Sequence, residues 1–450
     1  MLFSRWLIGL VIIAALVAAG QVAAAADPTG RPNVILIMVD DWGYETVAAN
    51  GSTSYQTPQI DRLASEGARF ERCYAQPLCT PSRVQLMTGQ YNVRNYVRFG
   101  LLDDKQQTFA HWFKQAGYST CIVGKWQLGG GFDGPKHFGF DEYCLWQLTR
   151  RPPRYANPGM EINGREVDYS AGEYGPDLVN DYLCDYIERN REQPFFAYYP
   201  MMLTHSPYDP TPDSKEYDKT VTGPENQRKI AKPKHFADMV AYTDKMIGKL
   251  VAKLDALKMR ERTLILITGD NGTGKGTVSR VGDREVIGGK GQTTETGMHV
   301  PLVVNWKGTI TPGIVNRDLI DFTDMAPTML EAARLAKPEG WHLDGRSFWS
   351  QLQGQPGQPR ESIYSWYAPD GGPSGVEFAR GDRFKLYRNG RIFDVVQDPD
   401  EKDVLELASL KLTERQTIAR LQQSLDRFKD ARPAWTYEGV ELKGKRKGAK

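Results

Sequence analysis

Residues 34–41 of the chain are Val34-Ile35-Leu36-Ile37-Met38-Val39-Asp40-Asp41, an apolar run that ends in two acidic residues. Unbroken apolar runs rich in β-branched residues are typical of strands that are covered on both faces of a parallel sheet. Sheets of this kind bind ligands beyond the carboxyl ends of their strands. The stretch therefore predicts a buried strand that places Asp40 and Asp41 at the ligand-binding edge of an α/β domain.

The same pattern, an apolar run followed by polar or charged residues, recurs three times. The runs are 120–123 before Gly124-Lys125, 195–199 before Thr204-His205, and 263–267 before Gly269-Asp270-Asn271-Gly272. Helical patterns lie between the runs, one beginning at Thr57-Pro58 and the clearest spanning residues 235–257. Strands that alternate with helices predict an α/β fold with a large, mainly parallel central sheet flanked by helices. The polar residues that follow these strands are expected to converge at one edge.

The pattern changes near Asp344-Gly345. Proline and glycine crowd residues 355–359 and 369–375, and two short strand patterns flank Asn389-Gly390, a strong hairpin signal. With a last helix expected over residues 413–428, these features predict a smaller C-terminal α+β subdomain; an elaborate edge of the main sheet is the alternative. The expected units are a signal peptide (1–26), a catalytic domain (27–345), the C-terminal subdomain (346–437) and a basic tail (438–450).

Composition limits the partners and the compartment. The 450 residues include 57 Lys and Arg against 55 Asp and Glu, so no basic excess indicates a nucleic acid partner. Arg5, the apolar run 7–19 and Ala24-Ala25-Ala26 follow the plan of a secretory signal peptide. An uncleaved anchor is the alternative, but the run is short for a membrane span. We expect a periplasmic or extracellular protein without stable membrane insertion.

The cysteine count is odd. The chain has five cysteines and no CxxC spacing: Cys73, Cys79, Cys121, Cys144 and Cys184. In an oxidising compartment one thiol then stays unpaired or is modified. Cys79 is the candidate because Thr80 and Pro81 predict a helix start beside it, and helix N-termini favour bound anions. Arg83 adds a cation one turn later. A buried structural cysteine beside an ordinary capped helix fits the same residues.

Two pairs of oxygen-bearing residues follow two of the predicted strands. Asp40 and Asp41, with Asp270 and Asn271, form an all-oxygen ligand set of the kind that Ca²⁺ or Mg²⁺ prefers. Each pair alone can serve a turn or a helix cap, but two pairs at the ends of two buried strands favour a metal site. The formal glycosylation sequon 271–273 is set aside, because the same argument buries Asn271.

Cys79-Thr80-Pro81-Ser82-Arg83, followed by Met87-Thr88-Gly89, resembles the signature of the type I, formylglycine-dependent sulfatases of the alkaline phosphatase superfamily. The resemblance covers nearly the whole mature chain. Further motifs match in the same order: Asp40-Asp41, Gly124-Lys125-Trp126, 204–207, Asp270-Asn271-Gly272, 290–301, 384–387 and 393–399. The resemblance implies an alkaline-phosphatase-like fold and conversion of Cys79 to formylglycine by a separate formylglycine-generating enzyme.

The resemblance also implies the chemistry. The formylglycine aldehyde hydrates to a geminal diol, and one hydroxyl attacks the sulfur of a sulfate ester while the alcohol leaves. The second hydroxyl then expels sulfate and regenerates the aldehyde. By the same resemblance, Asp40, Asp41, Asp270 and Asn271 would hold Ca²⁺, with Mg²⁺ the less favoured ion.

Four further positions take catalytic roles by the resemblance. Arg83 would orient and stabilise the formylglycine hydrate. Lys125 and Lys290 would hold sulfate oxygens as charge shifts during the reaction. His205 would protonate or stabilise the departing alkoxide, together with Lys290.

The chain departs from the family pattern at two positions. The family usually has His two residues after the Lys125 position, where it acts as the base that helps expel sulfate; here the residue is Gln127. An amide cannot accept the proton, although it can hold a sulfate or formylglycine oxygen. His299 stands where many relatives carry Arg before Val-Pro, and we expect it to adjust the substrate pocket.

We therefore expect a secreted sulfatase that acts on a sulfated carbohydrate. Arginine and aromatic residues suited to an anionic sugar fall in loops that can reach the sheet edge: Arg94, Tyr96, His137, Trp146, Arg150 and Arg151. One alternative is a formylglycine-dependent phosphodiesterase or phosphonate hydrolase of the same superfamily. The other, motivated by Gln127, is a non-catalytic binder of sulfated glycans.

Overall fold

A computed structural model describes residues 30–220 and 232–440 of the chain. The predicted signal peptide lies outside the described residues, as do residues 441–450 of the predicted basic tail. The described strands form an 11-stranded sheet, a two-stranded hairpin and a four-stranded sheet. No helix in these ranges is long and apolar enough to span a membrane.

Five parallel strands form the middle of the large sheet, in the order β8-β1-β7-β3-β4. They are β1 (Asn33–Val39), β3 (Ser119–Lys125), β4 (Glu142–Trp146), β7 (Phe195–Pro200) and β8 (Thr263–Gly269). Every residue of β1 is buried. The four strands predicted from apolar runs are thus β1, β3, β7 and β8, which are neighbours in the sheet.

Shorter strands flank this parallel core. On one side lie β11 (His299–Asn305), β2 (Ala68–Tyr74), β12 (Ile314–Asn316) and β13 (Ile320–Asp321), and on the other β5 (Gly159–Ile162) and β6 (Arg165–Asp168). β11 runs antiparallel to both β8 and β2, and β5 runs antiparallel to β4 and β6. Because β11 is antiparallel to β8, its first residues lie at the edge where the parallel strands end.

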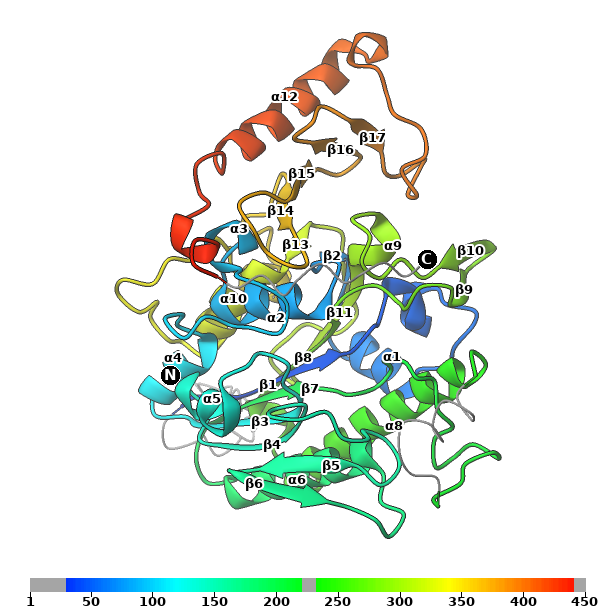
Figure 1. The fold of residues 1–450 in the computed structure, drawn as a ribbon, viewed down its shortest axis with the longest axis vertical. Coiled ribbons are helices and arrows are strands. Elements are labelled where there is room, and N and C mark those ends of the chain that lie inside the picture. The colour runs from blue at the N-terminus through cyan, green and yellow to red at the C-terminus, as the bar shows by residue number, and fades with distance from the viewer. Residues whose placement is uncertain (1–29, 221–231, 441–450) are drawn as a thin grey trace, which may run out of the picture.

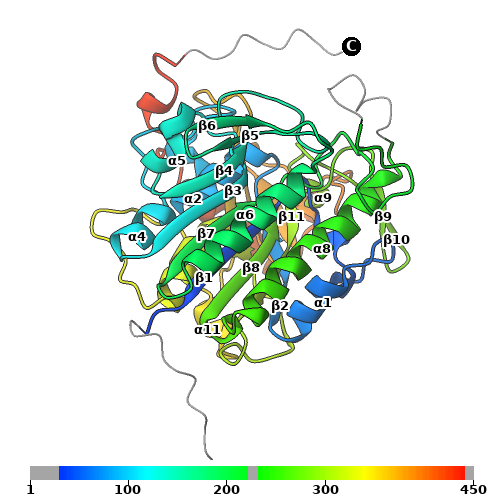
Figure 2. The same cartoon turned by 90° about the horizontal axis from the view of Figure 1, so that it is seen from below.

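Helices cover both faces of the sheet. One face carries α1 (Pro58–Ser65), α6 (Gly175–Arg189) and α8 (His235–Ala256), which lie in front of the strands in Figure 2. The other carries α2 (Cys79–Thr88), α4 (Phe109–Gln115) and α10 (Met325–Ala332), and Figure 1 shows α2 and α10 across the sheet from α6 and α8. Alternate residues of β1 enter two different hydrophobic clusters, which is why the strand is apolar throughout.

The remaining short elements are mostly in connections. They are α3 (Asn92–Asn95), α5 (Gly134–His137), α9 (Glu295–Met298), α11 (Trp349–Leu352) and the hairpin of β9 (Val278–Val281) with β10 (Arg284–Ile287).

The C-terminal region forms a lobe of its own, at the top of Figure 1. It contains the antiparallel sheet β14 (Ile363–Tyr367), β15 (Val376–Arg380), β16 (Phe384–Tyr387) and β17 (Ile392–Asp394), packed on α12 (Leu412–Asp426). Asn389-Gly390 connects β16 to β17 as predicted, and Gly390 supplies the positive φ of 88°. Among the described strands none belongs to both sheets, so the alternative of an extended main-sheet edge is wrong.

Candidate active site

The predicted oxygen ligands meet at the carboxyl edge of the central sheet. Asp40 and Asp41 follow β1, and Asp270 and Asn271 follow its neighbour β8. The backbone N–H of Asp41 donates to Asp270 Oδ1 at 2.9 Å, and Asn271 Nδ2 donates to Asp41 Oδ1 at 2.9 Å. Asp41 has a positive φ of 59°, so the chain turns sharply just after the strand.

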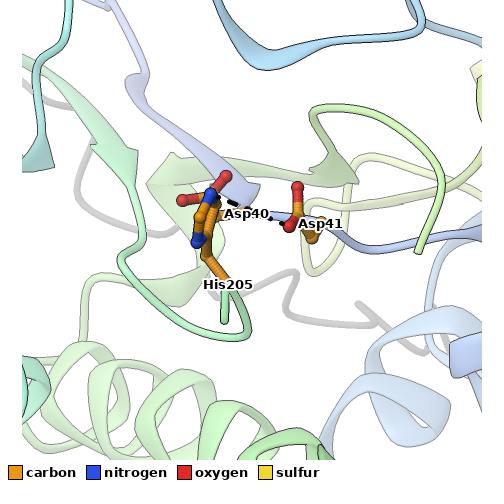
Figure 3. A group of neighbouring side chains, drawn as sticks. All are labelled: Asp40, Asp41 and His205. Atoms are coloured by element: carbon orange, nitrogen blue, oxygen red, sulfur yellow. Dashed lines mark ion pairs between the residues drawn. The ribbon is translucent and has the colours of Figure 1, made fainter. Parts of the chain in front are cut away.

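Two oxygens of this group lack partners. Asp40 Oδ1 and Asn271 Oδ1 are buried and accept no hydrogen bond from any described residue. Buried polar atoms are nearly always bonded, and an exception needs an explanation such as an ion. His205 lies next to the two aspartates that follow β1. Its ligand atom and those of Asp40 and Asp41 all lie within 4.8 Å of one another (Figure 3). The donor set therefore fits a metal ion.

Each of the three carboxylates also faces a cation. The pairs are Lys125 Nζ with Asp40 Oδ2 at 2.8 Å, Lys290 Nζ with Asp41 Oδ1 at 2.5 Å, and Arg83 Nη2 with Asp270 Oδ2 at 3.2 Å. The side chains of Lys125 and Arg83 are 1% exposed, whereas that of Lys290 is 18% exposed. Lys290 is thus the cation of this group that reaches toward solvent.

The pKa shifts follow from burial and from these pairs. Burial raises the pKa of Asp40, but the nearby charges of Lys125, Lys290 and Arg83 outweigh it and lower that pKa. Burial and the neighbouring Asp40 raise the pKa of Asp270 to about 7 against the opposing charge of Arg83. The cations therefore keep Asp40 charged, and this charge disfavours a second one on Asp270.

Helix α2 begins earlier than the sequence pattern predicts. The helix starts at Cys79 with Leu78 as its N-cap, so Thr80 is not the cap and Pro81 is the third helical residue. Thr80 Oγ1 instead accepts a hydrogen bond from the backbone of Gly100 at 3.2 Å. The first-turn N–H groups have no partner within the helix, so Pro81 loses nothing in this position. Cys79 therefore stands in the first turn itself.

The Cys79 thiol points at Gln127. Cys79 Sγ donates to Gln127 Oε1 at 3.0 Å, and Gln127 is 6% exposed. Burial raises the pKa of the Cys79 thiol, although the charges of Lys125 and Lys290 oppose the shift. The thiol is thus neutral near pH 7. All five cysteines are unpaired, so the odd cysteine count does not itself distinguish Cys79.

His205 is held by its own loop. Its Nδ1 lies 2.6 Å from the carbonyl oxygen of Ser206, and its Nε2 lies 3.9 Å from Asp41 Oδ2. The hydroxyl of Tyr155 donates to the carbonyl oxygens of His205 and Met202 and so fixes the loop that carries His205. Burial lowers the pKa of His205 to about 3 although Asp41 and Asp40 act in the opposite direction. The imidazole is therefore neutral, with Nε2 turned to the carboxylates.

Glycines allow the strand ends to approach the neighbouring backbone. A Cβ on Gly124, which has φ of 112°, would lie 2.0 Å from the carbonyl oxygen of Pro200. A Cβ on Gly272 would lie 1.9 Å from that of Thr296. In Gly124-Lys125 and Asn271-Gly272, the glycine thus lets the backbone approach the neighbouring chain and so brings the adjacent side chain into the site.

His299 lies apart from this group. Its ring stacks between Tyr44 and Tyr74, at centroid distances of 4.1 and 5.1 Å, and Nε2 lies 2.8 Å from the carbonyl oxygen of Glu71. The structure thus brings Gln127 to Cys79 and engages His299 in an aromatic stack at the start of β11.

Residues 32–335, which include every side chain of the group around Asp40, match the family model described as Sulfatase. The chain belongs to the sulfatase family. Residues 290–430 also match the model described as N-sulphoglucosamine sulphohydrolase, C-terminal. The sulfatase is therefore a sulfuric ester hydrolase of the alkaline phosphatase superfamily, and the predicted family and fold are confirmed.

Named relatives agree. The sulfatase is 32% identical to N-acetylgalactosamine-6-sulfatase of Canis lupus familiaris in an alignment 372 residues long that covers 74% of this chain and 68% of the relative. It is 30% identical to human (Homo sapiens) arylsulfatase A in an alignment 400 residues long that covers 79% of this chain and 74% of the relative. Among solved structures, Ps i-CgsB in complex with k-i-k-neocarrahexaose superimposes with a TM-score of 0.75 at 25% identity, covering 90% and 94% of the two chains.

The loop residues that were predicted to reach the sheet edge lie in different places in the structure. Trp146 ends β4 in register with Lys125, whereas Arg150 pairs with Asp168 at 2.7 Å and Arg94 with Asp344 at 2.9 Å. Arg154 and Tyr155 were not among the predicted residues, because they stand between prolines and carry no periodic signal.

Proposed function

We propose that this sulfatase is a secreted carbohydrate sulfatase that uses formylglycine derived from Cys79 together with a bound Ca²⁺. The observation that carries the proposal is Cys79 Sγ at 3.0 Å from Gln127 Oε1, in the first turn of α2. A neutral buried thiol is a poor nucleophile, so the unmodified residue does not account for hydrolysis. Formylglycine supplies an aldehyde hydrate as the nucleophile, and Ca²⁺ supplies a Lewis acid.

We assign Asp40, Asp41, Asp270 and Asn271 as the Ca²⁺ ligands. The unpartnered oxygens of Asp40 and Asn271 support this assignment, as does an all-oxygen donor set. The ligand set suits Ca²⁺ better than Mg²⁺, because it consists of protein oxygens while Mg²⁺ usually keeps several waters.

The cations are proposed to bind the sulfate group. Arg83 is fixed by donating to the carbonyl oxygen of Lys125 at 3.0 Å as well as to Asp270, and it orients the residue at position 79. Lys125 and Lys290 hold sulfate oxygens and stabilise the charge that develops on them. These groups are fixed before substrate arrives, so little reorganisation is needed during the reaction.

Three residues act on the leaving groups in this proposal. Lys290 donates to the departing alcohol oxygen, and His205 does so from Nε2 only when the ring is protonated, because Nδ1 of the neutral ring donates to the carbonyl oxygen of Ser206 and leaves Nε2 as an acceptor. Gln127 holds a sulfate or formylglycine oxygen through its side-chain amide. Because an amide cannot accept the proton that must be removed when sulfate is expelled, release of sulfate is the slower half of the reaction. His299, apart from these residues, is proposed to adjust the substrate pocket indirectly, by fixing Tyr44 in its aromatic stack.

The substrate class is inferred from the named relatives, and the compartment from the N-terminal sequence. A relative named as an N-acetylgalactosamine-6-sulfatase and a neighbour solved with a neocarrahexaose support a sulfated carbohydrate as the substrate. We further propose removal of residues 1–26 on secretion to the periplasm or the exterior, and maturation by a formylglycine-generating enzyme. The catalytic domain is assigned to residues 27–345 and the C-terminal subdomain to 346–437.

Mass spectrometry of the peptide that contains Cys79 tests the proposal directly. Protein expressed with the modifying enzyme is expected to carry the aldehyde and to hydrolyse sulfate esters, and activity is expected to fall on chelation and return with Ca²⁺. An unmodified thiol under these conditions, or modified protein inactive across a broad sulfate ester panel, would refute it.

The same assay separates the alternatives. A phosphodiesterase or phosphonate hydrolase would prefer the phosphate member of a sulfate and phosphate pair built on one alcohol. A non-catalytic glycan binder, the hypothesis that Gln127 motivates, would bind sulfated sugars and leave them unchanged.

A further inference from the structure

The loop that follows β4 lies beside the proposed active site. Trp146, the last residue of β4, is in register with Lys125 on the neighbouring strand. The loop is anchored at several points, since Trp146 Nε1 donates to the carbonyl oxygen of Pro152 at 2.9 Å and Tyr155 OH donates to that of His205. The backbone N–H of Gly175 also donates to the carbonyl oxygen of Tyr155 at 2.8 Å. A side chain in this loop is therefore held in a fixed relation to His205.

Arg154 is the unusual residue of this loop. Its guanidinium carbon lies 4.1 Å from the centroid of the Trp146 ring, a stack that fixes the plane of the guanidinium. Its Nη1 is buried and has no hydrogen-bond partner among the described residues. The carboxylate oxygen Asp209 Oδ1 is likewise buried and without a partner in the part of the chain that the structure describes. A donor held in place and left unsatisfied is suited to a ligand.

Arg154 lies on the His205 side of the active site, because the hydroxyl of the next residue, Tyr155, donates to the carbonyl oxygen of His205. The charge of Arg154 also opposes the rise that burial causes in the pKa of Asp209. The proposed sulfate position already has Lys125, Lys290 and Arg83, each paired with a carboxylate. Arg154 is thus a surplus cation on the His205 side of the site.

We propose that Arg154, stacked on Trp146, binds a second anionic group of the substrate, so that the preferred substrate is a saccharide with a further sulfate or carboxylate close to the sulfate that is removed. The inference rests on the proposed sulfatase function and narrows its substrate class. A planar guanidinium donates two parallel hydrogen bonds to either oxyanion.

The test uses the full chain with formylglycine in place. Initial rates are measured for 4-nitrophenyl sulfate and for matched saccharide sets built on galactose, N-acetylgalactosamine and glucosamine. Each set contains a monosulfated sugar, its disulfated form and a disaccharide in which a uronate adjoins the monosulfated sugar. The wild type is expected to favour a member with two anions by roughly tenfold in kcat/KM, the value of one charge-assisted hydrogen-bond pair. Whether sulfate or carboxylate gives the preference identifies the second group.

Arg154→Gln is expected to reduce that preference to about twofold or less, mainly through KM, and Arg154→Lys to retain part of it. Arg150→Gln is the matched control, because Arg150 pairs with Asp168 and Glu166 and is expected to keep the wild-type preference. Three results would overturn the inference alone: no preference in an active wild type, a preference unchanged in Arg154→Gln, or an equal loss on all substrates with a lowered Tm. The last would make Arg154 a structural partner of Asp209. Failure of the matured wild type on every ester would instead refute the sulfatase proposal on which the inference rests.

Discussion

Two groups of buried charged residues contact α2, one through Arg83 and the other through Gln85, and they differ in how well their polar atoms are satisfied. The edge cluster consists of Asp40, Asp41, Asp270, Arg83, Lys125 and Lys290 at the ends of the central strands. The Arg360 cluster consists of Asp321, Asp324 and Arg360. In the Arg360 cluster, Asp324 accepts from the backbone N–H of Asp321 at 2.9 Å, from that of Arg346 at 2.6 Å and from Arg360 Nε at 2.7 Å.

This difference distinguishes a cluster that stabilises the fold, around Arg360, from a cluster that is proposed to bind a ligand, at the sheet edge. Both oxygens of Asp324 are bonded, and Arg360 also donates to Tyr91 and Thr323. The edge cluster is as deeply buried, yet leaves Asp40 Oδ1 unpartnered. Unsatisfied buried charge costs stability unless a ligand completes it, whereas a satisfied network fixes structure. The Arg360 cluster fixes α2, since Gln85 on that helix donates to Asp321 at 3.0 Å, and α2 carries Cys79 to the edge cluster.

The largest expected effect is at Cys79, because α2, which contacts both clusters, begins with this residue. Cys79→Ala is expected to lower kcat by at least about 10³-fold, because the proposed nucleophile is lost, and to leave the fold intact. Cys184→Ala, on α6 and equally unpaired, is the control and is expected to retain turnover. Steady-state rates with circular dichroism decide the point, and an active Cys79→Ala variant would contradict the assignment.

Asp40→Asn tests the unsatisfied side of the comparison. Loss of one carboxylate from the proposed metal site is expected to lower kcat/KM by about 10²–10³-fold and to weaken Ca²⁺ binding. Titration calorimetry with Ca²⁺ alone measures the second effect. Unchanged Ca²⁺ affinity in this variant would place the ion elsewhere.

Arg360→Gln tests the satisfied side. Removing one partner of a buried ion pair leaves Asp324 uncompensated, and the free energy of unfolding is expected to fall by about 3 kcal/mol. Turnover per folded molecule is expected to stay within about threefold of wild type at 15 °C, since Arg360 does not contact the edge cluster. Urea unfolding gives the first quantity, and Arg360→Lys provides a milder variant. A large loss of turnover without loss of stability would erase the distinction between the clusters.

The pH dependence of stability sharpens the comparison further. Burial raises the pKa of Asp321 to about 7 against the opposing charge of Arg360, while an unfolded Asp titrates near about 4. The native state therefore keeps this proton longer, and the stability it contributes is lost as pH rises from about 4 to 7. Asp321→Asn is expected to gain stability relative to wild type over that range, by at most about 1.4 kcal/mol per pH unit. Urea unfolding at pH 5 and pH 8 measures the change; a constant difference would be inconsistent with it.

The smallest expected effect concerns the uncharged neighbour of the edge cluster. Gln127→His introduces a group that can accept a proton near neutral pH, and kcat is expected to rise about threefold if release of sulfate limits turnover. Gln127→Asn keeps the amide and serves as the control. Burst kinetics show which half-reaction changes, and a fall in kcat for the His variant would count against slow release.

Much of the fold and part of the candidate site were predictable from the sequence. The run 34–41 predicts a buried parallel strand and an acidic pair because both faces of β1 are covered and the ligand edge follows its carboxyl end. Asp270-Asn271 and Lys125 follow from the same rule. The start of α2 was predicted two residues late, because Pro81 is tolerated throughout a first turn.

The sequence by itself determined the alternation of strands with helices, the C-terminal hairpin and the residues that end the central strands, because these depend on local periodicity and on chain direction. The tertiary structure alone decided that Cys79 contacts Gln127, that His205 turns Nε2 toward Asp41, and that His299 stacks between two tyrosines. It also decided that Arg154 rests on Trp146 while the Arg360 cluster satisfies itself. These contacts join segments far apart in the chain, and their geometry depends on how loops cross the sheet edge, which no local pattern encodes.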